Sequence, residues 1–515
     1  MPRTPFMGEV ARALRLANLG DETSPTLSRR QLLQSAAAAA MAANPLFASA
    51  MSGPSAPRIA IIGGGLAGLA CADTLRQKGY AAQVYDANSR LGGRCWSLRG
   101  FFPGQVAERG GELIDTPHKT MLAYANRFNL AVEDVKRKAG ETSFHFMGQN
   151  WPEGDIVDQF RAVASRIRAD LKASSGAPTY DNHNQADIDL DNTDLASYLA
   201  SRCAGYPLVQ KVLDVAYNIE YGLETSEQSA LNLILFMRIN SRSKFQPFGV
   251  SNERYHIAGG NDLVVQGLAS ELVQPAEMGA ALTRLRKNGF GEYEMFFNGS
   301  STPVKADYVV LTMPFTAMRD VILEPSLGLS AEKQNAIATL GYGTNAKCMV
   351  GFDARVWNTV HGASGEAYGD LANFQSSWET NRANSGPHAV ITDYSGGVRG
   401  ASLSQAGLQS QVDAWLTDFD TIFPGAKATA TTVSSSYLAH LEHWPSNPLT
   451  KGSYTCYRPG QFTTVAGLEG TPVGKLKFAG EHADSFYSWQ GYMEGACLSG
   501  IRAAGEVLGD IKAGR

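Results

Sequence analysis

The hydrophobic positions of the chain follow two periods, one typical of buried strands and one typical of amphipathic helices. Residues 58–62 form a short apolar run with β-branched side chains, as buried parallel strands do. Residues 69–78 then have helical spacing, and residues 81–85 form a second strand-like run. The pattern predicts a strand, a helix and a second strand near the start of the folded chain.

Helical and strand-like segments alternate through the rest of the sequence. Asn288 and Gly289 separate two alternating runs and predict a β-hairpin that joins residues 282–286 to residues 293–297. Helical periodicity dominates from about residue 120 to 250 and is clearest at 121–128, 195–200, 208–219 and 231–239. Both patterns recur between about residues 330 and 455, so strands and helices are expected there in alternation.

Composition narrows the class of protein without identifying it. The chain has 515 residues, with 44% apolar and 18% charged positions, which predicts an ordinary globular protein of two or more domains. A formal net charge of −4 provides no basic stripe, so nucleic acid is not an expected partner. The six cysteines form no CxxC pair and no metal-ligand spacing, so neither a disulfide framework nor a metal site is predicted.

The first 50 residues differ in character from the rest. Residues 28–33 (Ser-Arg-Arg-Gln-Leu-Leu) precede an alanine-rich apolar run, and residues 48–50 (Ala-Ser-Ala) have the small-x-small form of a cleavage site. Asn44 and Pro45 interrupt the run, which is too short for a permanent membrane anchor. The paired arginines resemble a twin-arginine export signal, which implies periplasmic or extracellular delivery in a bacterium. Residues 1–50 are therefore predicted to be an export signal peptide.

A glycine-rich turn follows the first predicted strand. Gly63 allows a tight turn, Gly65 lets the backbone approach a pyrophosphate, and Gly68 lets the helix pack close to the strand. The helix N-terminus would offer its N–H groups to the phosphates. Asp86 ends the second strand, at about the number of residues after the glycine turn where a carboxylate would accept ribose hydroxyls. Together these residues predict a dinucleotide-binding unit.

The residues after Asp86 indicate which dinucleotide is bound. Arg90, Gly93 and Arg94 lie in Arg-Leu-Gly-Gly-Arg, which resembles the Arg-x-Gly-Gly-Arg signature of FAD-dependent amine oxidases. Two arginines beside flexible glycines can pair with a pyrophosphate. The resemblance implies FAD as cofactor.

Later segments extend this resemblance from residue 57 to about residue 510. Residues 253–260 and 306–314 are similar to the segments by which the family chain returns to the flavin domain, and Gly480 and Glu481 follow a strand at the position of a family FAD contact. The implied fold is α/β, with a Rossmann-like FAD-binding domain of the glutathione-reductase type interleaved with an α+β substrate-binding domain. The expected FAD-binding parts are 57–120, 251–325 and 456–512, and the expected substrate-domain parts are 121–250 (helical) and 326–455 (sheet).

Two tyrosines match the aromatic cage of the monoamine oxidases. Residues 489–496 (Trp-Gln-Gly-Tyr-Met-Glu-Gly-Ala) resemble the family segment that brings Met493 to the flavin and supplies Tyr492 as one wall. Residues 452–455 (Gly-Ser-Tyr-Thr) supply Tyr454 as the second wall. Ser453 replaces the cysteine that bonds the flavin in that family, which predicts FAD held non-covalently. Two π-faces can align a slim substrate and desolvate its amine.

Two further residues complete the catalytic set that the resemblance implies. Lys347 matches the family lysine that holds a water near flavin N5, and Trp444 matches a tryptophan beside the flavin. With Tyr454 and Tyr492 they would serve an amine oxidase that takes a hydride from the carbon beside the nitrogen. The product is an imine that water hydrolyses, and O2 is reduced to H2O2.

The substrate is less closely defined. Amino-acid oxidases of the superfamily usually place an arginine after the Gly110-Gly111 pair, whereas this chain has Glu112 there. Glu112, with Glu220, could bind a substrate cation, or Glu112 could instead be held by a backbone N–H or an arginine. An oxidase of amines, some with a second positive group, is the leading hypothesis.

Other assignments stay open. An L-amino-acid oxidase, with basic amino acids as one substrate class, would need its carboxylate-binding arginine from elsewhere, for which Arg238, Arg242 and Arg254 are available. A dehydrogenase with a protein electron acceptor is a further alternative for the function. A homodimer is an open alternative for the oligomeric state. An inert flavoprotein is disfavoured because Lys347 and both cage tyrosines are present.

Overall fold

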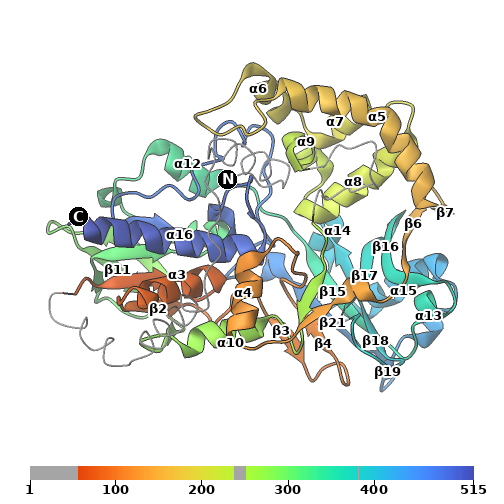
Figure 1. The fold of residues 1–515 in the computed structure, drawn as a ribbon, viewed down its shortest axis with the longest axis horizontal. Coiled ribbons are helices and arrows are strands. Elements are labelled where there is room, and N and C mark those ends of the chain that lie inside the picture. The colour runs from red at the N-terminus through yellow and green to blue at the C-terminus, as the bar shows by residue number, and fades with distance from the viewer. Residues whose placement is uncertain (1–55, 237–250, 381, 515) are drawn as a thin grey trace, which may run out of the picture.

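The computed structural model describes residues 56–236, 251–380 and 382–514. Figure 1 shows two halves side by side, one built on a parallel sheet with long helices and the other on a larger sheet with a cluster of helices above it. The predicted export signal, residues 1–50, lies outside the described residues. No helix among the described residues is long and apolar enough to cross a membrane.

The first half is built around a five-stranded parallel sheet. Its order is β22 (Leu476–Phe478), β13 (Tyr308–Leu311), β1 (Ile59–Ile62), β2 (Ala82–Asp86) and β9 (Glu277–Met278). In register, Ile59 of β1 lies opposite Tyr308 and Ala82. All four residues of β1 are buried, because the sheet is covered on both faces. This confirms the predicted α/β fold with a Rossmann-like unit.

The two faces of β1 contact different layers. Ile59 and Ile61 pack toward α3 (Leu66–Gln77) and α16 (Met493–Lys512), which lie together in Figure 1. Ala60 and Ile62 pack toward a four-stranded sheet of β12 (Val304–Ala306), β11 (Tyr293–Phe297), β10 (Leu282–Lys287) and β14 (Ile322–Leu323). The predicted hairpin is confirmed as β10 and β11, and the Asn288 side chain accepts hydrogen bonds from the N–H groups of Phe290 and Glu292.

The second half holds a seven-stranded sheet. Its order is β21 (Ala439–His443), β15 (Ala346–Phe352), β18 (Ala389–Ser395), β17 (Phe374–Thr380), β16 (Ala363–Leu371), β6 (Glu141–Phe146) and β7 (Gln149–Trp151). Neighbouring strands are antiparallel except β16 and β6, which are parallel. α15 (Leu408–Ile422) presses Trp415 and Phe419 into an aromatic core with Phe352 and Phe374. Thus β6 and β7, from the segment expected to be helical, join this sheet.

A cluster of helices lies above the sheet in Figure 1. They are α5 (Glu153–Ala173), α6 (Gln185–Asp191), α7 (Leu195–Arg202), α8 (Pro207–Tyr221) and α9 (Leu231–Phe236). The helices predicted at 195–200 and 208–219 are confirmed as α7 and α8, while the end of the one predicted at 231–239 lies outside the described residues. The C-terminal end of α8 carries Glu220 toward the sheet below.

Short elements link the halves. β3 (Ser97–Arg99) pairs with β4 (Val106–Glu108), and β5 (Val132–Asp134) pairs with β8 (Tyr255–Ile257). α4 (Lys119–Arg127) and α10 (Asp262–Ser270) flank them. These elements hold the turn of residues 108–112 against the seven-stranded sheet.

Candidate active site

One cavity of about 430 Å³ runs from the parallel sheet to the seven-stranded sheet. Its lining includes every predicted site residue except Gly68, which lies behind the wall. The carboxyl end of β1 and the start of α3 form one end. Side chains from β15, β17 and β18 form the other.

The cofactor end is shaped by the glycine turn. Gly63 has a φ of +112°, which only glycine adopts without strain. A Cβ on Gly68 would lie 1.9 Å from the carbonyl oxygen of Gly63, so the close approach of helix and strand requires glycine there. Gly65 is the N-cap residue of α3 and provides no side-chain hydrogen bond to the helix, and the first turn carries no acidic residue. The open N–H groups at this helix end therefore fit the phosphates of a dinucleotide.

Asp86 lies beside this turn. Its carboxylate accepts hydrogen bonds from the backbone N–H of Gly64 at 2.6 Å and of Asn88 at 2.7 Å, and it lines the cavity. These bonds fix the carboxylate while leaving lone pairs toward the cavity, as a ribose-binding acid requires.

The predicted arginines lie deeper along the same end. Arg94 Nη1 donates to Glu481 Oε1 at 2.9 Å and to the carbonyl of Ser453 at 2.6 Å. The other Glu481 oxygen accepts from the Thr455 hydroxyl and the Gly491 N–H, both at 3.0 Å. Arg94 and Glu481 thus tie together three distant chain segments at the cavity wall.

Arg90 contacts its own loop. It donates to the carbonyls of Leu91 and Gly93, and its guanidinium lies 3.7 Å from the centre of the Trp96 ring. Burial lowers the pKa of Arg90, and the nearby charge of Arg109 lowers it further. A positive group in this setting gains from a bound pyrophosphate, which supports its predicted role.

The predicted aromatic walls lie at the other end of the cavity. The Tyr454 hydroxyl lies 2.8 Å from the Tyr394 hydroxyl, and the Tyr492 hydroxyl forms a hydrogen bond with Glu220. The Tyr394 and Trp378 rings are 5.0 Å apart between centroids. Sequence reasoning did not identify Tyr394 and Trp378, because an aromatic residue in a strand is usually a core residue. The site is therefore an aromatic box with more walls than the two predicted.

Glu112 has a different partner from the predicted substrate cation. Its Oε2 accepts from Lys347 Nζ at 2.7 Å, and its Oε1 accepts from Trp378 Nε1 at 2.9 Å. Lys347 also donates to the carbonyls of Gly110 at 2.7 Å and Glu108 at 3.2 Å. Both oxygens of Glu112 are thus engaged, and the partner is a lysine rather than the arginine or backbone N–H considered as the alternative.

Ser453 and Trp444 also line the cavity. The Ser453 hydroxyl donates to Asn345 Oδ1 at 2.6 Å and is buried. The Trp444 indole donates to the Arg109 carbonyl at 3.0 Å and closes one side of the Gly110 turn. Met493, the first residue of α16, lies against Gly111, where a Cβ would be 2.7 Å from the Met493 Cγ. Ser453 is thus held by a side-chain amide, Trp444 by a backbone carbonyl and Met493 by close packing against Gly111.

Two carboxyl groups in the cavity are poised to change charge near neutral pH. Burial, together with the charges of Glu253 and Asp115, raises the pKa of Glu220 to about 8 against the opposing hydrogen bond from Tyr492. Burial also raises the pKa of Glu253 to about 7, with Lys136 opposing the shift. Both side chains face the cavity rather than bulk water, so a positive group entering there would favour their ionised forms.

The candidate arginines for binding a carboxylate have different outcomes. Arg254 pairs with Asp134 at 2.8 Å on an exposed surface and does not line the cavity, so it is not placed to bind a substrate carboxylate there. Arg238 and Arg242 lie outside the described residues. Arg382 and Lys136, which sequence reasoning did not consider, do line the cavity. Arg382 donates to the carbonyls of Lys138 at 2.6 Å and Ala139 at 3.0 Å.

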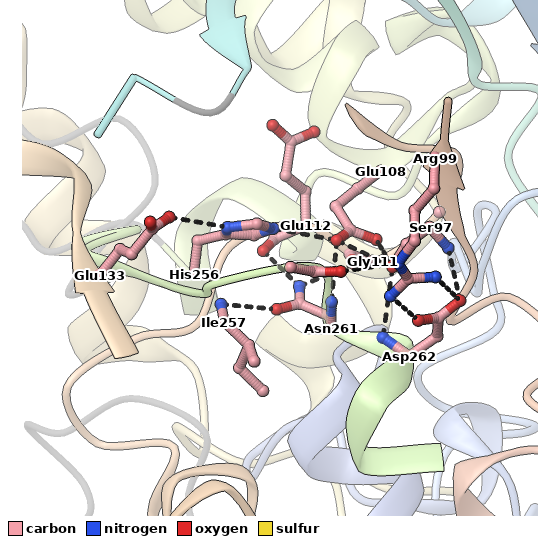
Figure 2. Close-up of polar contacts among 12 residues, drawn as sticks. Ser97, Arg99, Glu108, Gly111, Glu112, Glu133, His256, Ile257, Asn261 and Asp262 are labelled. Atoms are coloured by element: carbon pink, nitrogen blue, oxygen red, sulfur yellow. Dashed lines mark hydrogen bonds and ion pairs between the residues drawn. The ribbon is translucent and has the colours of Figure 1, made fainter. Parts of the chain in front are cut away.

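A buried polar network lies behind the turn of residues 108–112 (Figure 2). The Glu108 carboxylate is fully buried and accepts from His256 Nε2 at 2.9 Å, from the Asn261 N–H at 2.8 Å and from the Ser97 hydroxyl at 2.8 Å. Burial alone would lower the pKa of His256, but its hydrogen bonds to Glu108 and Glu133 raise it to about 9. The network therefore contains a buried ion pair.

Comparison with known proteins agrees with this geometry. The family described as flavin containing amine oxidoreductase matches residues 66–508. The protein named "Putative L-amino-acid oxidase YobN" of Bacillus subtilis (strain 168) is 24% identical over 473 residues, covering 87% of this chain and 94% of its own length. Cyclohexylamine oxidase from Brevibacterium oxydans IH-35A has the same fold, with a TM-score of 0.74, 20% identity and coverage of 88% and 99% of the two chains. Wild-type putrescine oxidase bound to putrescine aligns with a TM-score of 0.71 and 18% identity, with the same coverage.

Proposed function

Since the chain belongs to the flavin-containing amine oxidoreductase family, we propose that its substrate is a small amine that carries a second positive group. FAD-dependent amine oxidation follows from membership of the family. The bound cofactor supplies the two-electron oxidation of the C–H bond beside the substrate nitrogen. The chain's own residues bind the amine, exclude water and hold charge near it.

The residues present fit FAD. The open helix end at Gly65 and the arginine pair Arg90 and Arg94 would hold the pyrophosphate, and Asp86 would hold the ribose. We propose that FAD is bound without a covalent bond. The proposal is supported by Ser453, whose hydroxyl is engaged with Asn345 and is no thiolate. Acid precipitation should release all of the yellow chromophore into the supernatant, and flavin that stays with the pellet would refute it.

Glu220 carries the proposal of a second positive group. Its carboxyl faces the cavity beside Tyr492, and Glu253 lies near enough to raise its pKa. Two neighbouring carboxyls that can ionise in a buried site favour a cation between them, because its charge offsets their mutual repulsion. The aromatic walls Tyr454, Tyr394 and Trp378 suit an alkyl ammonium through their π-faces. The amine to be oxidised and the second positive group can thus occupy one box.

A second candidate is an L-amino-acid oxidase. It is favoured by Arg382 and Lys136, two cations that line the same cavity and could hold a substrate carboxylate. The curated relative from Bacillus subtilis carries an L-amino-acid oxidase name. A basic amino acid would satisfy both the cationic and the anionic groups.

Anaerobic reduction of the flavin distinguishes the candidates. Purified, FAD-loaded protein would be mixed with cyclohexylamine, putrescine, L-leucine or L-lysine while the flavin absorbance is followed. We expect putrescine to bleach the flavin fastest and L-leucine to leave it oxidised. Bleaching by amino acids alone, weakened in Arg382→Met but not in Glu220→Gln, would replace the amine proposal with the second candidate. Reoxidation with O2 or with a protein electron acceptor would then separate an oxidase from a dehydrogenase.

A further inference from the structure

Glu112 lies between two side chains of the cavity wall. One carboxylate oxygen accepts from Lys347 and the other from the Trp378 indole. The exposed fractions of the Lys347 and Glu112 side chains are 7% and 5%, so bulk water does not screen the pair. The Lys347 ammonium also lies 5.4 Å from the centre of the Trp378 ring. The three side chains form one contiguous unit, which we call the lysine clamp.

The main chain of the clamp is held from behind. Asn261 Nδ2 donates to the carbonyl of Glu112 at 2.6 Å and to that of Gly111 at 3.1 Å, as Figure 2 shows. The Asn261 N–H donates to Glu108, whose own carbonyl accepts from Lys347. The backbone from which the Glu112 side chain extends is therefore fixed.

Charge explains why the clamp needs a carboxylate. A buried ammonium costs several kcal/mol unless it is paired and hydrogen-bonded. Three protein oxygens accept from Lys347, and only Glu112 among them carries a full negative charge. Without it, the positive charge of Lys347 would be held by carbonyl dipoles alone. Trp378 in turn engages the second oxygen of Glu112, which keeps that carboxylate from turning to another partner.

We propose that Glu112 is a positioning residue that holds the Lys347 ammonium in place at the wall of the cavity. The inference rests on the proposed function, because Lys347 acts only beside a bound flavin. A positive charge there stabilises the negative charge that develops on O2 as it accepts electrons. Glu112 would then affect the oxidative half of the cycle, and not the binding of the substrate cation for which its sequence position first suggested a role.

A double-mutant cycle tests this assignment. The proteins are the parent, Glu112→Gln, Lys347→Met and the double variant, with Glu366→Gln as a matched control. Glu366 is also a carboxylate of the cavity wall, but it pairs with Lys136. Each protein is reduced with dithionite, mixed with O2 at pH 6 to 10, and followed by flavin absorbance. The flavin midpoint potential is measured as a second readout that does not depend on turnover.

We expect Lys347→Met to slow reoxidation at least tenfold. In Glu112→Gln reoxidation should also slow, by less than in Lys347→Met, because a neutral amide holds the ammonium less firmly than a carboxylate does. In the Lys347→Met background, Glu112→Gln should have no further effect on the rate. The midpoint potential should fall in Lys347→Met and rise in Glu112→Gln, and Glu366→Gln should match the parent in both measurements.

Two results would overturn the inference. Additive losses in the double variant would mean that Glu112 acts independently of Lys347. A Glu112→Gln protein that matches the parent in both the reoxidation rate and the midpoint potential would show that Glu112 does not position Lys347. Trp378→Phe keeps both charges and serves if Glu112→Gln does not fold; it should slow reoxidation in the same direction by less. Because dithionite needs no amine, these outcomes are separate from a failure of the proposed substrate class.

Discussion

Replacing His256 with glutamine removes a buried positive charge and leaves an amide that can still donate to Glu108. In the parent protein the imidazole lies between two carboxylates, 2.9 Å from Glu108 and 3.4 Å from Glu133. Its side chain is 4% exposed, so solvent screens these contacts little. The variant therefore loses the ion pair while keeping one hydrogen bond.

The magnitude follows from the pKa of His256. Its folded-state value of about 9 lies above the unfolded value of 6.5, so the ion pair stabilises the fold fully below pH 6.5 and ceases to do so as pH rises through 9. The difference between the two pKa values corresponds to a contribution of about 3 kcal/mol to the free energy of unfolding at low pH, at 1.36 kcal/mol per pKa unit. For a chain of this length that is a fall of roughly 3 °C in Tm.

The assay is thermal unfolding of the FAD-loaded parent and variant from pH 5.5 to 10. The gap in Tm should be widest below pH 6.5 and should close above pH 9. Ser97→Ala is the control, because it removes a neutral donor to the same carboxylate. The loss in its free energy of unfolding should be about 2 kcal/mol at every pH, as for a hydrogen bond to a charged group. A His256→Gln gap that stays constant from pH 5.5 to 10 would refute the buried ion pair.

Two further predictions concern the cavity. Gly68→Ala places a Cβ within 1.9 Å of the Gly63 carbonyl oxygen and should reduce the flavin retained after gel filtration. Gly505→Ala, which has open space around it, is the control and should retain the full amount of flavin. Equal retention in the two variants would contradict the proposed glycine contact. The affinity for putrescine should fall about tenfold from pH 9 to pH 7, because Glu220 with a pKa of about 8 must lose its proton to bind a cation. The affinities of the parent and of Glu220→Gln are first corrected for the ionisation of the amine, which is the same for both proteins. In Glu220→Gln the corrected affinity should not fall between pH 9 and pH 7. An identical pH dependence in the two proteins would exclude Glu220 as the cation site.

Local sequence patterns were sufficient for the dinucleotide unit. The strand, glycine turn and helix at residues 59–77 are contiguous, and each glycine has a steric reason that can be stated without the fold. The same holds for the hairpin at Asn288, whose side chain organises its own turn. Such features depend on neighbours within a few residues, so the sequence alone predicts them.

Contacts between residues or strands that are far apart in the sequence could not be predicted from local patterns. Lys347 and Glu112 are 235 residues apart, and nothing in either segment indicates that one is the partner of the other. β6 pairs with β16 more than two hundred residues later, which placed a strand where helices were expected. α5 was also not singled out, although Ile156, Phe160, Val163 and Ile167 form one buried face along it. Tertiary packing determined these features, and it also brought Trp378 and Tyr394 into the site.

The order of strands in the parallel sheet has a consequence for synthesis of the protein. β1 and α3 leave the ribosome early, but β22 and α16, which complete their sheet and cover α3, lie roughly 400 residues later. At a translation rate of roughly 5–20 residues per second, those last elements are synthesised roughly 20 to 80 s after the glycine turn. A nascent chain therefore presents an unfinished nucleotide site with one helix face uncovered. Flavin binding is then a late event of maturation, and chaperones would have to shield the uncovered face of α3 until translation ends.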